Sequence, residues 1–409
     1  MKINIWFLFT FLVFFVNTVG LPHGLLYTTL LTPFLYIWSV RRLPVEPVSV
    51  FLLLLGPFVV IHLLNGVDIR SNFISIANLL CIYIFCCAFF VFLKSCHTLE
   101  IFFYRLLKIN FILCLIAIPF YFTPWHELFW IEQYLTKGIT QFRRLKMFTY
   151  EASYYSTLFT PLFFFFFLQI IFRQNRINGR ILLCMLISPL LLSFSMGVIA
   201  CIFIACSGVF VVYMWRLLRK KRVFAFAVSG LLTVLFALLF LWVLFPDNPL
   251  FVRIANIITG NDSSGRGRTT DSFILAEKIA DLKSLVWGAG LGQIKVLGTD
   301  IIRDYYNYPA DYPIAIPNAT AETLAIFGWA GLFLRLFIEV SLFMYTQVWK
   351  NYYRLLLFIF IFIYQFTGSY ITNIAEYMIW ILAFTNIFPQ FDVNSLSGKR
   401  KPVSRNSFL

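Results

Sequence analysis

The sequence predicts an all-α polytopic integral membrane protein of about 12 transmembrane helices, interrupted by one large outer loop. The chain is 60% hydrophobic and only 12% charged, which is about half the charge of a soluble domain. Apolar runs long enough to span a bilayer recur along nearly its whole length, and its mean hydropathy is +0.83. Between residues 246 and 317 this pattern stops and a segment of mixed polarity takes its place.

Twelve apolar runs account for the predicted helices. They lie approximately at 3–20, 24–40, 48–66, 73–93, 109–125, 151–172, 181–195, 197–215, 223–245, 318–348, 355–371 and 373–390. The domain organisation that follows is 1–245 with nine helices and a smaller outer loop at 124–150, a large periplasmic loop at 246–317, three helices in 318–390 and a cytoplasmic tail at 391–409.

The basic residues predict the orientation. With both termini placed in the cytoplasm, nearly all Lys and Arg of the short loops lie on the inner side, as the positive-inside rule requires. Arg70 is the exception, and the remaining outer cations lie in 124–150 and 246–317. Most of the net charge of +15 is therefore explained by the Lys and Arg that orient the chain in the membrane. It gives no reason to expect a nucleic-acid partner.

The N-terminal span and the cysteines add two expectations. No small-x-small cleavage site precedes Leu21, so we interpret the first span as an uncleaved helix. All eight cysteines fall in predicted spans or in an inner loop. We therefore expect no disulfide on the outer side, and no cysteine pair has zinc-like spacing with histidine.

The smaller outer loop places cations beside a carboxylate. Arg143, Arg144 and Lys146 precede the sixth span, and Glu151 and Tyr154 lie at its start. One interpretation is that the cations contact lipid phosphates and that Glu151 stabilises the first helical turn through the helix dipole. The other is that these residues belong to a site for an anionic substrate.

The large loop carries a Gly/Ser-rich turn with two arginines, Arg266 and Arg268. Glycine lets backbone N–H groups approach an anion, and arginine can hold phosphate in a bidentate fork. An amphipathic helix is predicted over 271–286, because its apolar residues recur at helical spacing. Either it lies along the membrane surface or it packs against the protein. These apolar residues are Leu275, Ile279, Leu282 and Val286.

Glycines and tyrosines follow this helix. Gly288, Gly290 and Gly292 imitate part of a dinucleotide fingerprint, but no strand-turn-helix unit surrounds them, so we expect a tight, close-packed turn. Tyr305 and Tyr306 offer aromatic faces that can stack on sugars, although tyrosine is also a usual residue of the membrane interface.

The last third of the chain has isolated polar residues in apolar runs. Asn318 and Glu322 open the tenth span, where they face the region below the loop or stabilise its first turn. Arg335 and Glu339 are four residues apart and are expected to pair on one helix face, and Glu376 is expected to face the interior. The phenylalanine run 163–167 is most simply a lipid-facing filler.

These features together resemble the O-antigen polymerase (Wzy) family of the bacterial inner membrane, within the superfamily that also contains O-antigen ligases. The similarity covers roughly residues 143–335, and it lies in the order of four local motifs. They are Arg143 or Arg144 followed by Glu151, the serine-rich turn 193–197, Arg268 followed by the glycines of 288–292, and Glu322 followed by Gly328 and Gly331.

The resemblance implies a metal-independent glycosyltransferase without a cofactor, in the cell inner membrane. Such an enzyme transfers a growing glycan from undecaprenyl pyrophosphate onto a lipid-linked repeat unit at the periplasmic face. Membrane lipid and a chain-length regulator protein are further candidate partners. A ligase and a lipid-linked oligosaccharide flippase are the alternatives. The ligase is less favoured because no histidine lies in 246–317, and the flippase because the charges are concentrated in outer loops.

The chemistry assigns candidate roles. The departing diphosphate needs stabilising positive charge, and without an Asp-x-Asp pair outside, arginine supplies it. The candidate pyrophosphate clamp is Arg143, Arg144, Arg266 and Arg268. The candidate catalytic residues are Arg268, Arg266, Glu151, Asp271 and Glu322, with a carboxylate as general base. The candidate saccharide-binding residues are Tyr154, Tyr305, Tyr306 and Asn318.

Overall fold

The computed structural model describes residues 5–18, 21, 25–96, 99–133, 142–172, 174, 177–217, 242, 244, 252, 255–256, 259, 263–309 and 314–396. The ninth predicted span (223–245), the first part of the large loop (246–262) and the end of the tail (397–409) lie almost wholly outside these residues.

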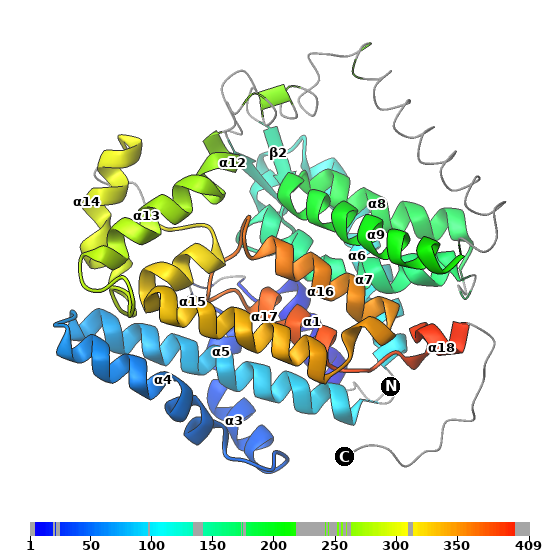
Figure 1. The fold of residues 1–409 in the computed structure, drawn as a ribbon. Coiled ribbons are helices and arrows are strands. Elements are labelled where there is room, and N and C mark those ends of the chain that lie inside the picture. Colours follow the sequence, from blue (N-terminus) through cyan, green and yellow to red (C-terminus); the bar gives the residue numbers. More distant parts are fainter. Residues whose placement is uncertain are drawn as a thin grey trace.

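The first half of the described chain is a series of apolar helices with one small hairpin (Figure 1). Its elements are α1 (Ile5–Phe15), α2 (Tyr27–Leu30), α3 (Thr32–Val40), α4 (Pro47–Leu64), α5 (Ile69–Ser95), α6 (Leu99–Phe120), the 3-10 helix η1 (Pro124–Leu128), β1 (Trp130–Gln133), β2 (Phe142–Leu145), α7 (Ala152–Ile171), α8 (Gly179–Ser193) and α9 (Met196–Leu217). The antiparallel pair β1–β2, which sets Glu132 opposite Arg143, lies in the smaller outer loop and is an addition to the all-α prediction.

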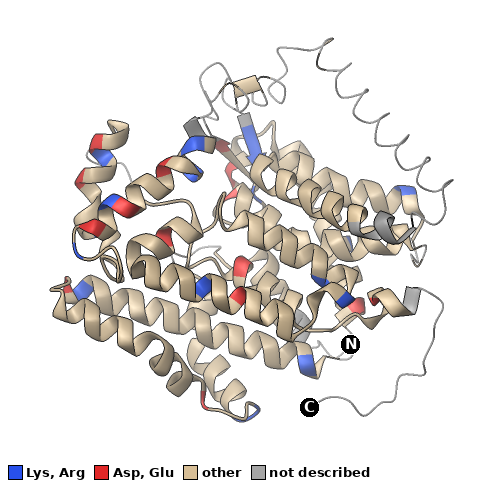
Figure 2. Ribbon diagram, viewed as in Figure 1, with Lys and Arg blue, Asp and Glu red and all other residues tan. Residues whose placement is uncertain are grey.

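The second half begins with the polar loop and returns to apolar helices. Its elements are α12 (Ser263–Arg268), α13 (Thr270–Asp281), α14 (Ile294–Tyr306), α15 (Ala319–Tyr345), the 3-10 helix η2 (Val348–Lys350), α16 (Tyr352–Tyr364), α17 (Ile374–Phe384), the 3-10 helix η3 (Pro389–Phe391) and α18 (Val393–Leu396). Figure 2 shows charged residues gathered on α13 and α14, whereas the long helices beside them are mostly uncharged.

Five of the described helices, α4, α5, α6, α7 and α15, are long and apolar enough to cross a membrane. The structure therefore supports a helical membrane protein, and the number of spans remains a prediction. Two predicted spans differ from the helices at their positions. The span 24–40 is divided into α2 and α3 at Leu31, with a proline in the first turn of α3. The span 355–371 stops being helical after Tyr364.

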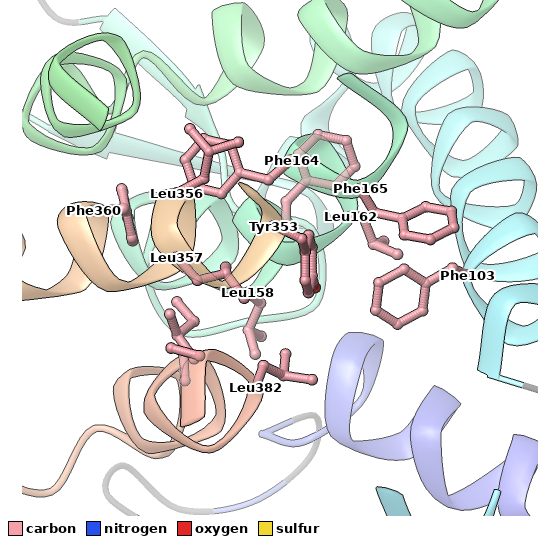
Figure 3. Close-up of a cluster of buried hydrophobic side chains, with 14 of the residues drawn as sticks. Phe103, Leu158, Leu162, Phe164, Phe165, Tyr353, Leu356, Leu357, Phe360 and Leu382 are labelled. Carbon is pink, nitrogen blue, oxygen red and sulfur yellow. The ribbon is translucent and has the colours of Figure 1, made fainter. Parts of the chain in front are cut away.

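The main core surrounds α7, whose side chains are nearly all buried. Phe164 and Phe165 are packed against α16, where Phe164 lies beside Phe360 and Phe165 beside Tyr353 (Figure 3). The prediction that the run 163–167 faces lipid is therefore wrong for its central residues. A membrane protein has the same apolar composition in its core and on its lipid face, so composition alone does not distinguish the two.

A second core joins the loop helices to α15. Leu275 and Ile279 of α13 are buried against α14 and α15, as the predicted amphipathic face requires. The helix ends at Asp281, earlier than predicted, and Leu282 and Val286 are exposed. The buried face of α13 therefore packs against the protein.

Glycines interlock this loop with α15. Gly328 has non-helical dihedral angles (φ 65°, ψ −167°) and breaks the helix. The segment 285–290 then supplies partners to backbone groups on both sides of the break, which matters because lipid offers none. The bonds are Trp329 N to Leu285 O (3.0 Å), Ala330 N to Val286 O (3.0 Å), Ala289 N to Ala325 O (2.9 Å) and Gly290 N to Ile326 O (3.0 Å).

The interlock explains the predicted glycine turn. Gly288 has a positive φ of 79°, and a Cβ there would lie 2.3 Å from the carbonyl oxygen of Ile326. A Cβ on Gly328 would likewise lie 2.3 Å from the carbonyl oxygen of Val286. Only glycine fits two backbones this close at left-handed dihedrals, so the close-packed turn is confirmed and its partner is Gly328.

Candidate functional site

A small cavity of about 20 Å³ lies where three segments distant in the sequence meet. The start of α7, the end of α12 and the turn between α16 and α17 form its walls. It is lined by Tyr150, Glu151, Ser153, Tyr154, Arg268, Pro317, Tyr364, Ser369, Tyr370 and Asn373. A second hollow on α3 is lined only by apolar side chains and two arginines, as expected of a membrane-interface surface. The first cavity is therefore the better candidate site.

Arg268 and Glu151 face each other in this cavity. The Arg268 Nη2 atom lies 3.7 Å from the Glu151 Oε1 atom, and the two side chains are 32% and 20% exposed. Glu151 is the N-cap residue of α7, but its side chain makes no capping hydrogen bond. Its carboxylate is therefore directed to Arg268 instead of to its own helix, and the loose pair leaves the guanidinium open to a further anion.

Three helices begin at the cavity. Glu151 precedes α7 and Asn373 precedes α17, and both residues line it. Pro317, which also lines it, is followed by Asn318 and the start of α15. Several first-turn N–H groups of α15 and α17 are bonded to protein groups, so these termini contribute the positive ends of their helix dipoles, which favour negative charge. Three such termini together with Arg268 make the cavity suitable for an anion such as phosphate.

Tyrosines form the remaining wall. The rings of Tyr150 and Tyr154 pack with their centroids 4.7 Å apart, and Tyr364 and Tyr370 line the cavity from the other side. Ser153, Ser369 and Asn373 add short polar side chains to the lining. Aromatic faces beside short polar groups can bind a saccharide, because a sugar ring has both apolar faces and hydroxyl edges.

The turn between α16 and α17, residues 365–373, is the part of the site that the sequence analysis missed. It was included in two predicted spans. Its polar residues, which interrupt two apolar runs, were the available signal. The first turn of α15 holds it through Ala319 N to Gly368 O (3.2 Å), Thr320 N to Gln365 O (3.2 Å), Asn318 Nδ2 to Phe366 O (2.7 Å) and Ile371 N to Glu322 Oε2 (2.7 Å).

Asn318 and Glu322 have supporting positions. Asn318 is fully buried, and its side chain bonds only to protein groups, so it supports the cavity wall without lining it. Glu322 accepts a hydrogen bond from the backbone of the 365–373 turn and does not line the cavity. These contacts favour a structural contribution over the saccharide-binding and catalytic roles expected from the sequence.

Arg266 and Asp271 form a second pair outside the cavity. The Arg266 Nη2 atom lies 3.7 Å from the Asp271 Oδ1 atom, and the Tyr305 hydroxyl donates to the same oxygen at 3.2 Å. Burial and the nearby Asp271 carboxylate raise the pKa of the Tyr306 phenol. The two arginines of α12 therefore serve different neighbours, since Arg268 faces the cavity and Arg266 faces α13 and α14.

Arg143 and Arg144 also have partners away from the cavity. Arg143 Nε donates to Glu132 Oε1 at 2.8 Å across the hairpin, and this bond lowers the pKa of the Glu132 carboxyl. Arg144 is buried, and its Nε donates to the Ser193 carbonyl at 3.0 Å. Neither lines the cavity, and both contact the hairpin or neighbouring segments.

A network of polar side chains joins α15, α17 and the start of the 365–373 turn. Arg335 pairs with Glu339 of its own helix (Nε to Oε1, 3.1 Å), as predicted, and with Glu376 of α17. It also donates to Gln365 and Thr323, each at 3.0 Å. Glu376 is buried, as expected. Among the described residues, no three His, Cys, Asp or Glu side chains form a group that could hold a metal ion.

No family model, curated protein or solved structure matches this chain. The function proposed next is therefore inferred from the residues of the cavity and from the motif resemblance.

Proposed function

We propose that this protein is a glycosyltransferase of the O-antigen polymerase type. It moves a growing glycan from undecaprenyl pyrophosphate onto a lipid-linked repeat unit at the periplasmic face of the inner membrane. The observation that carries the proposal is the cavity in which Arg268 faces Glu151 at the meeting point of three helix N-termini. This arrangement suits a substrate that is anionic at one end and a saccharide at the other.

In the proposed reaction, a hydroxyl oxygen of the acceptor sugar attacks the anomeric carbon of the donor glycan. The new carbon–oxygen bond forms as the bond from that carbon to the pyrophosphate oxygen breaks, and the leaving group takes the electron pair. Arg268 and the helix N-termini stabilise the negative charge on the departing diphosphate. The acceptor proton passes to a carboxylate acting as general base.

Glu151 is the favoured base among the three candidate carboxylates. It lines the cavity, whereas Asp271 is engaged by Arg266 and Tyr305, and Glu322 accepts the Ile371 backbone N–H. The long contact to Arg268 leaves the Glu151 carboxylate accessible to a hydroxyl group. Arg266 remains a candidate for a second contact with substrate, because its side chain is 60% exposed beside Tyr305.

Substitution of Arg268 tests the proposal. We expect Arg268→Ala to lower chain extension about 100-fold or more, because removing one preorganised charge-stabilising group costs about 3 kcal/mol of barrier. Arg268→Lys should retain part of the activity, since lysine keeps the charge and loses the fork geometry. The measurement is the surface polysaccharide ladder of cells that carry each variant as their only copy. The matched control is Arg70→Ala, an exposed arginine at the start of α5.

The ladder also separates the alternatives. A single repeat unit on the surface with Arg268→Ala, at normal membrane levels of the protein, agrees with a polymerase. A normal ladder would remove Arg268 from the site. Complete loss of surface repeats would favour a flippase, and long chains retained on the carrier lipid would favour a ligase.

A further inference from the structure

One buried amide connects the two walls of the cavity. The Asn318 Nδ2 group donates to the Arg268 carbonyl oxygen at 2.7 Å and to the Phe366 carbonyl oxygen at 2.7 Å. Its Oδ1 atom accepts from Ala321 N at 2.9 Å and from Thr320 Oγ1 at 2.8 Å. The Asn318 side chain is fully buried, so these four bonds are made away from water.

The two carbonyls that Asn318 binds lie at the end of one helix and just after the end of another. Arg268 is the last residue of α12, and Thr269 after it has non-helical dihedrals (φ −115°, ψ −100°). Phe366 lies in the turn after α16. Carbonyls at helix ends have no partner within the helix, and a buried carbonyl without any partner is unfavourable. The amide of Asn318 satisfies both at once.

The two segments carry different parts of the cavity. Arg268 contributes the guanidinium that faces Glu151, and the turn after Phe366 contributes Ser369, Tyr370 and Asn373. The bonds of Ala319 N, Thr320 N and the Glu322 carboxylate join the first turn of α15 to the 365–373 turn. The Asn318 amide joins it to that turn and to Arg268 as well.

We propose that Asn318 is a positioning residue that fixes the phosphate-binding Arg268 in register with the turn that receives the saccharide. The proposal rests on the function proposed above. Binding a saccharide joined to a diphosphate requires both walls at a fixed separation, because the two groups are covalently linked. A shift of either wall by about 1 Å would misplace one end of the substrate while the other stays bound.

Replacement of Asn318 by aspartate separates positioning from helix capping. Aspartate is as good an N-cap residue as asparagine, so the bond from Ala321 N is retained. An ionised carboxylate cannot donate and a protonated one has a single O–H, so at most one of the two carbonyls keeps a partner in either form. Asn318→Asp therefore removes the link between the walls with almost no change of shape. Asn318→Ser keeps a capping oxygen but is too short to reach both carbonyls, and it serves if the aspartate variant does not accumulate.

Asn351 provides a matched control. It is also buried, and it caps α16 by accepting from Arg354 N at 3.2 Å. Its Nδ2 group donates to the Phe388 carbonyl at 2.9 Å and to the Asp392 carboxylate at 2.7 Å. It lies at the opposite end of α16 from the 365–373 turn and does not line the cavity. Asn351→Ser does not set a second carboxylate against Asp392, so it is the control for Asn318→Ser and tests the loss of a buried amide where no substrate contact is expected.

The experiment uses the full chain in lipid nanodiscs and two measurements. The first is hydrogen exchange of the backbone amides in 263–273 and 365–373. The second is the affinity for farnesyl diphosphate, a short probe of the polyprenyl diphosphate group. We expect Asn318→Asp to speed exchange in both segments together and to raise the Kd for the probe about tenfold, as expected for the loss of one or two buried hydrogen bonds. Asn351→Ser should leave both quantities unchanged.

Unchanged exchange in either segment with Asn318→Asp would overturn the positioning role and leave Asn318 as a helix cap. Faster exchange in both segments with an unchanged Kd would show that the walls are coupled but that the coupling does not serve binding, and it would also overturn the proposal. If the wild-type protein does not bind the probe although exchange responds as expected, the diphosphate site proposed above fails and the structural link through Asn318 stands.

Discussion

Two arginine–glutamate pairs of this protein differ in how many protein partners the guanidinium group has. Arg335 lies inside the helical core, pairs with Glu339 and Glu376, and donates to Gln365 and Thr323 as well. Its side chain is 15% exposed and that of Glu376 only 1%. Arg268 lies at the cavity, 3.7 Å from Glu151, with 32% of its side chain exposed. The first guanidinium is occupied by the protein, and the second can bind a ligand.

The difference shows why residue type alone does not identify a site. A charge inside the membrane is a functional candidate by default, because burying it is costly. Here the intramembrane arginine is matched by carboxylates and amides, which favours a structural role. A third pair, Arg143 with Glu132, has a short contact of 2.8 Å between two partly exposed side chains of the hairpin. Burial and the number of partners, more than distance, separate the three pairs.

The largest effect is expected when the buried ion pairs of Arg335 are removed. Arg335→Ala leaves Glu339 and Glu376 in apolar surroundings without their cation, and we expect the free energy of unfolding to fall by about 3–5 kcal/mol. Thermal unfolding of the purified protein in detergent measures it. The matched control is the triple variant Arg335→Leu, Glu339→Gln, Glu376→Gln, which should recover much of the loss because no charge is left unpaired. A wild-type melting temperature for Arg335→Ala would show that the network does not stabilise the fold.

The cavity pair should affect turnover more than stability. Glu151→Gln keeps the shape of the side chain and removes the charge that would accept a proton, so we expect kcat to fall about 100-fold or more with little change in melting temperature. Initial rates of chain extension by the purified protein measure it. Glu127→Gln, an exposed carboxylate of the same outer segment, is the control. A rise of KM with unchanged kcat would instead assign Glu151 to orienting Arg268.

The smallest effect is expected at the hairpin. The hydrogen bond from Arg143 lowers the pKa of Glu132 in the folded protein. Its stabilisation is therefore fully present above the unfolded pKa and is lost as pH falls through the lowered folded value. Glu132→Gln should speed amide exchange in β1 and β2 slightly at pH 7, and this difference from wild type should disappear in acid. A difference that persists unchanged in acid would mean that the Glu132 charge does not order the hairpin.

Local regularities in the sequence predicted much of the helical framework. The spacing of Leu275 and Ile279 identified the buried face of α13, and the four-residue spacing of Arg335 and Glu339 predicted their ion pair. The glycines at 288–292 predicted a tight turn because few other residues adopt its dihedrals. Each of these inferences depends on neighbours within one or two turns of chain.

Contacts between elements that are distant in the chain were predicted less completely. Arg143, Arg144, Arg266 and Arg268 were equivalent candidates in the sequence, and only Arg268 lines the cavity. The 365–373 turn was placed within two spans, since its polar residues are few and its partners are in the first turn of α15. Asn318 was expected to touch substrate, and the structure buries it between two carbonyls.

The sequence by itself determined that this is a helical membrane protein with a polar segment at 246–317, because hydropathy and helical periodicity are properties of the chain alone. The tertiary structure decided which arginine contacts Glu151, which glycine packs against Gly288 and which helix N-termini lie at the same cavity. Those pairings depend on how buried backbone groups far apart in the chain satisfy one another, and no local pattern encodes that choice.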